Sequence, residues 1–346
     1  MGDIYRNNRA ALFAVAVVEL LLSGCAAMSQ DPKTVLIREP GNRTYNPAVS
    51  ISESAKELWE YAVLSENVYT DGWSVPSPRT RERVSDTASL RSAEKLKAYS
   101  DTCPPEGRLP LSDWTMWDNF PTQTLRDKAT EVGLYMEVWE KTVSPPVVAV
   151  IFRGTEFFSW RDWMSNFRWF SWLLRFLPTY KDQYTVVAQD TGKEVQENLK
   201  TRIENGRDHY KNVRIITTGH SLGGGLAQHL AYSLPAVQSS DGTLIPRVSN
   251  VYAFDLSPVT GWYSVKSDLR TLNAKGLKID RIFEHGEILS YARLILSYFN
   301  PPSANDPAIR EIRYNFVQSI NPFSSHSMRL IACALIAGSG QASIPG

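Results

Sequence analysis

The chain has 346 residues, enough to bury a large core either in one domain with insertions or in two domains. Its 37 basic and 36 acidic residues leave a formal net charge of +1, so the charge balance indicates neither a nucleic-acid-binding surface nor an acidic tail. Hydrophobic residues make up 43% of the chain, an ordinary share. No period of 20–50 residues repeats, so a solenoid is excluded as well.

The N-terminal residues have the composition of a signal peptide. Arg6 and Arg9 precede an apolar run at residues 10–22, which only Glu19 interrupts. This run is short for a transmembrane helix and has the length of a signal-peptide core. We therefore predict a signal peptide at residues 1–24.

A lipidation signal follows directly. The segment Leu22-Ser23-Gly24-Cys25 resembles the lipobox of bacterial lipoproteins, from which the charged Glu19 is a departure. The resemblance implies that Cys25 becomes the acylated N-terminus, and Ala26 after it implies sorting to the outer membrane, facing the periplasm. The alternative is a signal peptide that is uncleaved or conventionally cleaved.

The anchor is predicted to connect to the folded part of the chain through a polar segment. Residues 25–50 are polar and contain three prolines, so we predict a flexible tether there and a folded domain at 51–340. Apolar residues recur near helical spacing over residues 52–67. Ser52 and Ser54 are the alternative N-caps of this predicted helix.

The two cysteines beyond the anchor leave their pairing open. Cys103 and Cys333 could form a disulfide in an oxidising compartment. Equally, both could be buried free thiols, because Cys333 lies in an apolar run.

Apolar periodicity predicts alternating strands and helices along the rest of the chain. The predicted elements are a loop at 71–123 with one helix at 86–99, strands at 131–142, 147–152, 213–218, 248–254, 277–284 and 309–317, and helices at 186–210, 222–231, 287–299 and 328–336. The unbroken apolar run at 147–152 is typical of a strand covered on both faces. The alternation favours an α/β fold with a mostly parallel sheet between layers of helices.

The pattern G-x-S-x-G occurs at Gly219-His220-Ser221-Leu222-Gly223, between a predicted strand and a predicted helix. Such a turn strains the backbone of the middle residue and exposes its hydroxyl, and a Cβ on either glycine would collide with the turn. The helix N-terminus also directs amide groups at developing negative charge. Ser221 is therefore the predicted nucleophile, and the N–H of Leu222 is one predicted oxyanion donor.

A serine nucleophile needs a base that is oriented by an acid, and on this architecture the chain order is Ser, acid, His. We call the turn at residues 219–223, between the strand at 213–218 and the helix at 222–231, the elbow. His209 precedes the elbow strand, His220 lies within the elbow and His229 lies on the next helix, so none is expected to face the serine from across the site. His285 lies beside a candidate acid. Only His326 follows all the predicted core strands, and it is the predicted base.

The acid is expected just after the second strand beyond the elbow strand, where Glu287 lies. Glu284, on the same strand, is an alternative. Asp255, at the end of the preceding strand, is another. The carboxylates that do not serve as the acid are expected to form caps or salt bridges.

A second oxyanion donor is expected after the strand at 147–152, where Arg153-Gly154-Thr155 follows. Thr155 could offer both its N–H and its hydroxyl. The alternative is an ordinary polar turn at the end of a strand.

These motifs resemble those of the class 3 (fungal-type) lipase family. The matching segments are Val150–Thr155 with Asp162, Trp163 and Asn166, Thr218–Gly224 and, loosely, Phe254–Val259. Glu287-Ile288-Leu289 departs from the usual Asp-Ile-Val of the family. The resemblance covers roughly residues 125–330 and implies an α/β-hydrolase fold that cleaves acyl esters.

An aromatic-rich segment follows the predicted oxyanion loop. In the family that the chain resembles, this position holds a lid that opens at a lipid surface, so we predict a lid at 157–180. Its side chains would also suit an acyl-chain groove, while the alternative is an ordinary core. The aromatic residues concerned are Trp160, Trp163, Phe167, Trp169, Phe170 and Trp172.

The sequence thus predicts a lipid-anchored lipase with a Ser-His-acid triad and an acyl-enzyme intermediate. Metal ligands at the usual spacing and a phosphate-binding glycine loop are missing from the sequence, so we expect no metal or cofactor. Phospholipase A or acyltransferase activity on the same triad is an alternative. A non-catalytic lipid-binding envelope lipoprotein is an alternative of another class. The sequence sets no oligomeric state.

Overall fold

The computed structural model describes residues 31, 33–70, 103–104, 107–154, 183–205, 208–257, 260–287, 303–316 and 326–341. Several predictions lie outside these residues: the signal peptide, Cys25, the helices at 86–99 and 287–299 (apart from Glu287), Thr155 and the lid with its aromatic residues. Among the described helices, none has the length and apolar character needed to cross a membrane.

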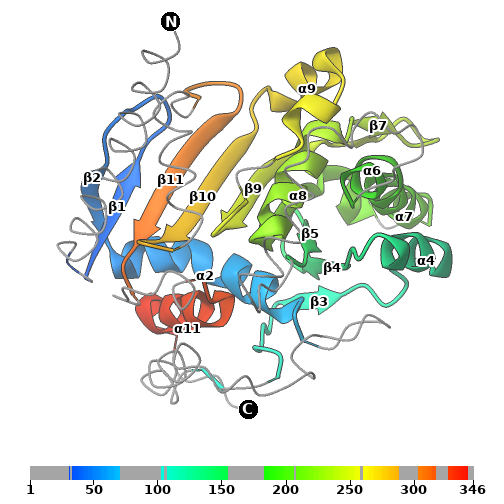
Figure 1. Ribbon diagram of the computed structural model, residues 1–346. Coiled ribbons are helices and arrows are strands. Elements are labelled where there is room, and N and C mark those ends of the chain that lie inside the picture. The colour runs from blue at the N-terminus through cyan, green and yellow to red at the C-terminus, as the bar shows by residue number, and fades with distance from the viewer. Residues whose placement is uncertain are drawn as a thin grey trace, which may run out of the picture.

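A nine-stranded sheet in the order β2-β1-β11-β10-β9-β6-β5-β4-β3 forms the centre of the described fold (Figure 1). The strands are β1 (Thr34–Arg38), β2 (Asn46–Ser50), β3 (Trp114–Met116), β4 (Met136–Lys141), β5 (Val147–Phe152), β6 (Arg214–His220), β9 (Val248–Phe254), β10 (Lys278–Glu284) and β11 (Ala308–Tyr314). The five strands from β11 to β5 are parallel, and each edge of the sheet ends in antiparallel strands. The carboxyl ends of the parallel strands therefore meet at one edge, where sheets of this kind bind ligands.

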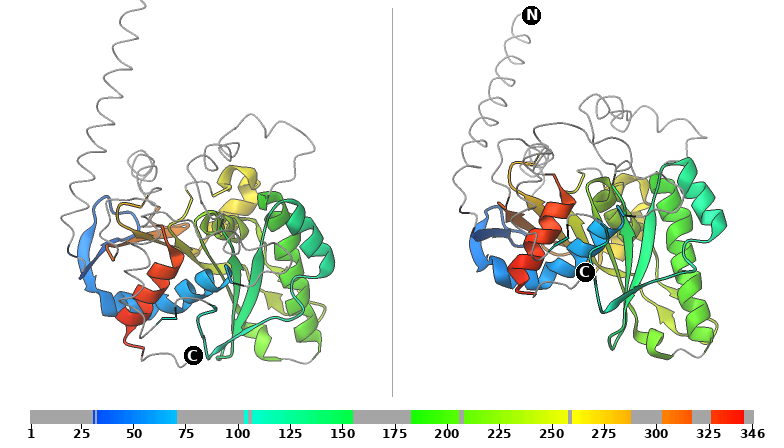
Figure 2. Two further views of the ribbon diagram at one scale, coloured as in Figure 1. Left: turned by 60° about the horizontal axis from the view of Figure 1, so that its bottom comes forward. Right: turned by 90° about the horizontal axis from the view of Figure 1, so that it is seen from below.

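Helices cover both faces of this sheet (Figure 2). They are α2 (Ile51–Asn67), α4 (Gln123–Glu131), α6 (Gln183–Val186), α7 (Gly192–Glu204), α8 (Leu222–Ser233), α9 (Ser267–Ala274) and α11 (Met328–Ser339). Val148 and Val150 of β5 point to the core shared with α7 and α8, whereas Ala149 and Ile151 point to the core shared with α2 and α11. The prediction that β5 is covered on both faces is confirmed. A small hairpin, β7 (Val237–Gln238) and β8 (Leu244–Ile245), lies outside the main sheet.

The predicted tether is wrong for residues 34–50, because these residues form β1, β2 and the connection between them. β1 pairs with β11, and the buried Arg38 side chain forms an ion pair with the buried Glu311 carboxylate of β11. Tyr45 donates its hydroxyl proton to the same carboxylate (2.5 Å). Burial and the negative charge of Glu311 raise the pKa of Tyr45. Polar residues thus satisfy one another inside the fold, which composition alone did not predict.

Helix α2 begins earlier than predicted. Its N-cap is Ser50, whose hydroxyl accepts the N–H of Glu53 (3.3 Å). The Glu53 carboxylate accepts the N–H of Ser50 in return (3.2 Å), which completes a capping box. Neither Ser52 nor Ser54 is the N-cap, because the capping box forms at Ser50, two residues before Ser52.

Two other elements are shorter than the sequence predicts. The strand expected at 131–142 begins only at Met136, because α4 continues to Glu131 and a turn with Gly133 at φ 67° follows. The helix expected at 186–210 is interrupted by a π-helical turn at Val187–Thr191 and ends with α7. A 3-10 turn at Asp208–Asn212 then leads into β6.

The role of the N-terminal strands can be tested with Arg38→Met. We expect the free energy of unfolding to fall by about 3–5 kcal/mol, because Glu311 would stay buried without its ion-pair partner. Urea denaturation of the two proteins measures this difference. Adding Glu311→Gln to the variant should recover part of the loss, since it removes the buried charge. An unchanged denaturation midpoint in Arg38→Met would instead fit a tether.

Candidate active site

Ser221 lies at the sharp turn between β6 and α8. Its backbone angles are φ 57° and ψ −122°, and among the described residues only Ser221 and Asp255 are non-glycine residues with positive φ. The N–H of Ser221 donates to the carbonyl of Phe254 in β9 (2.9 Å), and its own carbonyl accepts the N–H of Ser257 (2.9 Å). The turn is therefore tied to β9 and to the residues that follow it, and such contacts maintain a strained backbone.

The two glycines of the pattern are required by close backbone contacts. A Cβ on Gly219 would lie 2.5 Å from the carbonyl carbon of Gly223, and one on Gly223 would lie 2.1 Å from the carbonyl oxygen of Phe152. The predicted collision is confirmed. The predicted exposure of the Ser221 hydroxyl is not, because the whole residue is buried. The G-x-S-x-G pattern therefore predicts the backbone conformation of the turn but not the solvent exposure of Ser221.

The structure brings His326 and Glu287 together. His326 lies just before α11, and its Nδ1 is 3.1 Å from Oε2 of Glu287, which follows β10 and is fully buried. Asp255 Oδ2 lies 3.8 Å from the same Nδ1, beyond a direct hydrogen bond. Asp255 Oδ1 instead accepts the N–H of Glu284 (2.9 Å). Of the three candidate acids, Glu287 is the one in hydrogen-bond contact with His326.

Of the other histidines considered as the base, His285 and His229 have contacts with other elements, whereas His220 lies beside His326. The backbone N–H of His285 donates to the backbone carbonyl of Tyr314 (2.7 Å). The His229 ring packs edge-on against Tyr184, with 5.1 Å between ring centroids. The ring of His220, by contrast, lies 4.6 Å from the ring of His326. His220 therefore enters the site, although its place inside the elbow argued against it.

Tyr69 is a site residue that sequence analysis missed. Its hydroxyl accepts the N–H of Gly154 (3.0 Å) and lies 3.0 Å from Nδ1 of His220. A Cβ on Gly154 would lie 2.3 Å from the carbonyl oxygen of His220 and 3.0 Å from the Cβ of Ser221. The segment after β5 is thus pressed against the elbow and bonded to Tyr69. Tyr69 follows α2 and lies 85 positions before Gly154, so no local pattern connects the two.

The predicted oxyanion donors can be placed only in part. Leu222 is the first residue of α8, where a helical N–H has no partner within its own helix. Thr155 lies outside the described residues, directly after Gly154.

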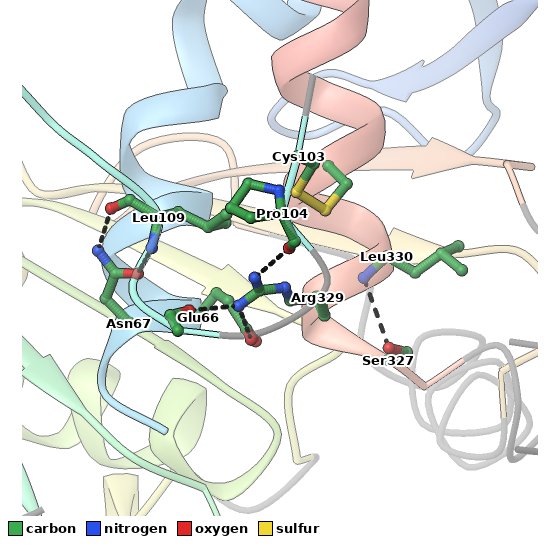
Figure 3. Close-up of a disulfide and its surroundings, with 10 residues drawn as sticks. Glu66, Asn67, Cys103, Pro104, Leu109, Ser327, Arg329 and Leu330 are labelled. Carbon is green, nitrogen blue, oxygen red and sulfur yellow. Dashed lines mark hydrogen bonds and ion pairs between the residues drawn. A yellow bond between two sulfur atoms is a disulfide. The ribbon is translucent and has the colours of Figure 1, made fainter. Parts of the chain in front are cut away.

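The start of α11, just after His326, is held by buried charges (Figure 3). The Arg329 guanidinium lies 3.3 Å from the Glu66 carboxylate of α2 and donates to the carbonyls of Gly107 (2.7 Å) and Pro104. Both charged side chains are buried, so each neutralises the other in a place that water cannot reach. This ion pair and the two hydrogen bonds hold the end of the helix next to His326.

A disulfide joins Cys103 to Cys333 of α11, close to the Arg329–Glu66 ion pair (Figure 3). The sequence left this pairing open, because neither cysteine lies in a pattern that names its partner. The bond therefore joins Cys103, the neighbour of Pro104, to the helix that carries Arg329.

Three described side chains could in principle share a metal ion. His220, Asp255 and His326 place ligand atoms within 4.8 Å of one another. Asp255 Oδ2 is 4.0 Å from His220 Nε2 and 3.8 Å from His326 Nδ1. Tetrahedral zinc with bonds of about 2.0–2.1 Å separates its ligand atoms by about 3.3 Å. The cluster is more open than that, and a polar network describes it better.

The strand order, the elbow after β6 and the histidine after the last parallel strand define an α/β-hydrolase fold. The family model of lipases (class 3) matches residues 149–286, from β5 to the turn after β10. No curated protein matches the chain.

Several solved structures are similar to this chain. One is the Rhizomucor miehei lipase propeptide complex, with 17% identity over 78% of this chain and 72% of that chain and a TM-score of 0.35. Another is a lipase from Rhizopus microsporus var. chinensis, with 17% identity over 75% and 77% and a TM-score of 0.33. Esterase B from Lactobacillus rhamnosis follows, with 14% identity over 67% and 84% and a TM-score of 0.29.

The disulfide gives a prediction for stability. Replacing both cysteines with serine (Cys103→Ser, Cys333→Ser) should lower the free energy of unfolding by about 2–5 kcal/mol, because the unfolded chain loses a long-range cross-link. Denaturation with and without a reducing agent measures the effect. The reducing agent should weaken the wild-type protein and leave the double variant unchanged. Recovery of the two cysteines as free thiols from non-reduced protein would contradict the assignment.

Proposed function

We propose that this chain is a class 3 lipase, a serine carboxylic-ester hydrolase with Ser221 as nucleophile, His326 as base and Glu287 as acid. The observation that carries the proposal is the 3.1 Å contact between His326 and Glu287 at the sheet edge where the strained Ser221 turn lies. The family match over residues 149–286 includes the elbow and ends one residue before Glu287. The order nucleophile, acid, base along the chain is also the one this fold uses.

The proposed reaction needs only groups of the protein and water. The Ser221 Oγ attacks the ester carbonyl carbon while His326 accepts its proton through Nε2. Glu287 holds the imidazole through Nδ1–H and stabilises the imidazolium. The Leu222 N–H, with Thr155 as second donor, stabilises the oxyanion.

Collapse of the tetrahedral intermediate breaks the bond to the alcohol, which leaves with the proton from His326. A water molecule then attacks the acyl-enzyme, and His326 accepts one of its protons. The second collapse returns this proton to Ser221 and releases the carboxylic acid. The cycle therefore ends with the free enzyme, one alcohol and one acid.

We propose lipid as the substrate class because of the aromatic segment at 157–180, which would present an apolar face to acyl chains. Phospholipase A and acyltransferase chemistry would use the same triad and differ only in headgroup or acceptor. We further propose that Cys25 anchors the mature protein in the bacterial cell envelope, at the periplasmic face of the outer membrane.

The nucleophile is tested with Ser221→Ala. The variant should lose at least about 10⁴-fold in kcat on p-nitrophenyl butyrate and palmitate, because no other group can form the acyl-enzyme. A fluorophosphonate probe should label the wild-type protein and leave the variant unlabelled. Ser233→Ala, at the far end of α8, is the matched control and should remain labelled. Equal hydrolysis by wild type and Ser221→Ala would refute the enzyme proposal and favour a non-catalytic lipid-binding lipoprotein.

The anchor is tested separately with Cys25→Ser in the full chain. Expressed in a bacterial host, the wild-type protein should partition with membranes and incorporate labelled fatty acid. The variant should do neither, because the acyl chains are expected to supply the binding energy for the membrane. Membrane partitioning that survives the substitution would show that Cys25 is not the anchor.

A further inference from the structure

Asp255 combines a positive backbone φ with a buried carboxylate. It has a backbone φ of 38°, a region that residues other than glycine adopt rarely and that Asp and Asn tolerate better than most. Its carboxylate is also fully buried, at the end of β9 and beside the Ser221 turn. Strained and buried polar residues of this kind persist where the surrounding structure holds them for a function.

The Asp255 carboxylate is held in a fixed orientation. Its Oδ1 accepts the N–H of Glu284, the last residue of β10 (2.9 Å). Its Oδ2 then faces two imidazoles, with His326 Nδ1 at 3.8 Å and His220 Nε2 at 4.0 Å. The backbone contact thus directs negative charge between the two rings.

The second imidazole belongs to a chain of contacts that reaches the segment after β5. The Tyr69 hydroxyl accepts the N–H of Gly154, so its own proton can go to Nδ1 of His220 (3.0 Å). That arrangement leaves the His220 proton on Nε2, facing Asp255. Within the part of the chain that the structure describes, the titratable groups in contact with His326 are Glu287 after β10, Asp255 after β9 and His220 at the end of β6.

We propose that Asp255 is a second positioning carboxylate for His326, acting together with Glu287. This inference rests on the proposed function, in which His326 becomes an imidazolium when it takes the proton of Ser221. Glu287 stabilises this cation by a hydrogen bond, and Asp255 stabilises it by its charge at 3.8 Å in a buried site. The proton stays on His326, and no bond to Asp255 forms.

Two carboxylates on one base make a specific prediction about Glu287→Gln. A triad with a single acid loses about 10⁴-fold in kcat when that acid becomes an amide. Because Asp255 still stabilises the imidazolium, Glu287→Gln alone should lose no more than about 100-fold. The double variant with Asp255→Asn should reach the full loss of about 10⁴-fold.

Two variants distinguish the effect of the Asp255 charge from the effect of its backbone conformation. Asp255→Asn keeps a side chain that tolerates positive φ, and Asp255→Gly relieves the strain altogether. Both remove the negative charge, which disfavours the protonated imidazole. The acid limb of kcat/KM against pH should move to lower pH by about one unit or more in both variants. Glu284→Gln, which neutralises another buried carboxylate, should not move it.

An NMR titration of the His326 ring in the Ser221→Ala background gives the same information without activity. The titration midpoint should fall in Asp255→Asn, whether or not the protein hydrolyses esters, so failure of the proposed function and failure of this inference are distinguishable. The inference is overturned if the His326 midpoint is unchanged in Asp255→Asn and Asp255→Gly. It is equally overturned if Glu287→Gln alone costs the full 10⁴-fold.

Discussion

The close approach of β5 to the start of α8 is the constraint on which the site depends. With a Cβ at Gly223 only 2.1 Å from the Phe152 carbonyl oxygen, the helix can lie this near the sheet only if the residue has no side chain. The same turn gives Ser221 its positive φ and fixes it at the carboxyl edge of the parallel strands. Neighbouring strands end at the same edge, so Asp255 and Glu287 follow β9 and β10 into one buried region.

The histidine side of the site is held by the other face of the sheet. His326 precedes α11, whose Arg329 is bound to Glu66 of α2 and whose Cys333 is bonded to Cys103. The helix that follows His326 is thereby held against the rest of the domain by one ion pair and one covalent bond. Such support fits the proposed chemistry, since a base must be held within a fraction of an ångström to take a proton.

The parts that could be predicted from the sequence are those with local signals. The apolar run of β5, the glycines around Ser221 and the position of His326 after the last parallel strand all follow from neighbouring residues. Contacts between distant segments were not predictable. Polar composition suggested a tether where Arg38 is paired with Glu311, and no pattern connects Tyr69 with Gly154. The acid was ambiguous for the same reason, because three carboxylates lie at or just after the ends of two adjacent strands and only their orientation distinguishes them.

The central claim is a covalent acyl-enzyme on Ser221, and intact-protein mass spectrometry tests it most directly. After rapid mixing with p-nitrophenyl butyrate and an acid quench, we expect the mass to rise by one butyryl group. Peptide mapping should then place that group on Ser221. A butyryl group found on another residue, or hydrolysis at full rate with no acylated protein at any mixing time, would contradict the account.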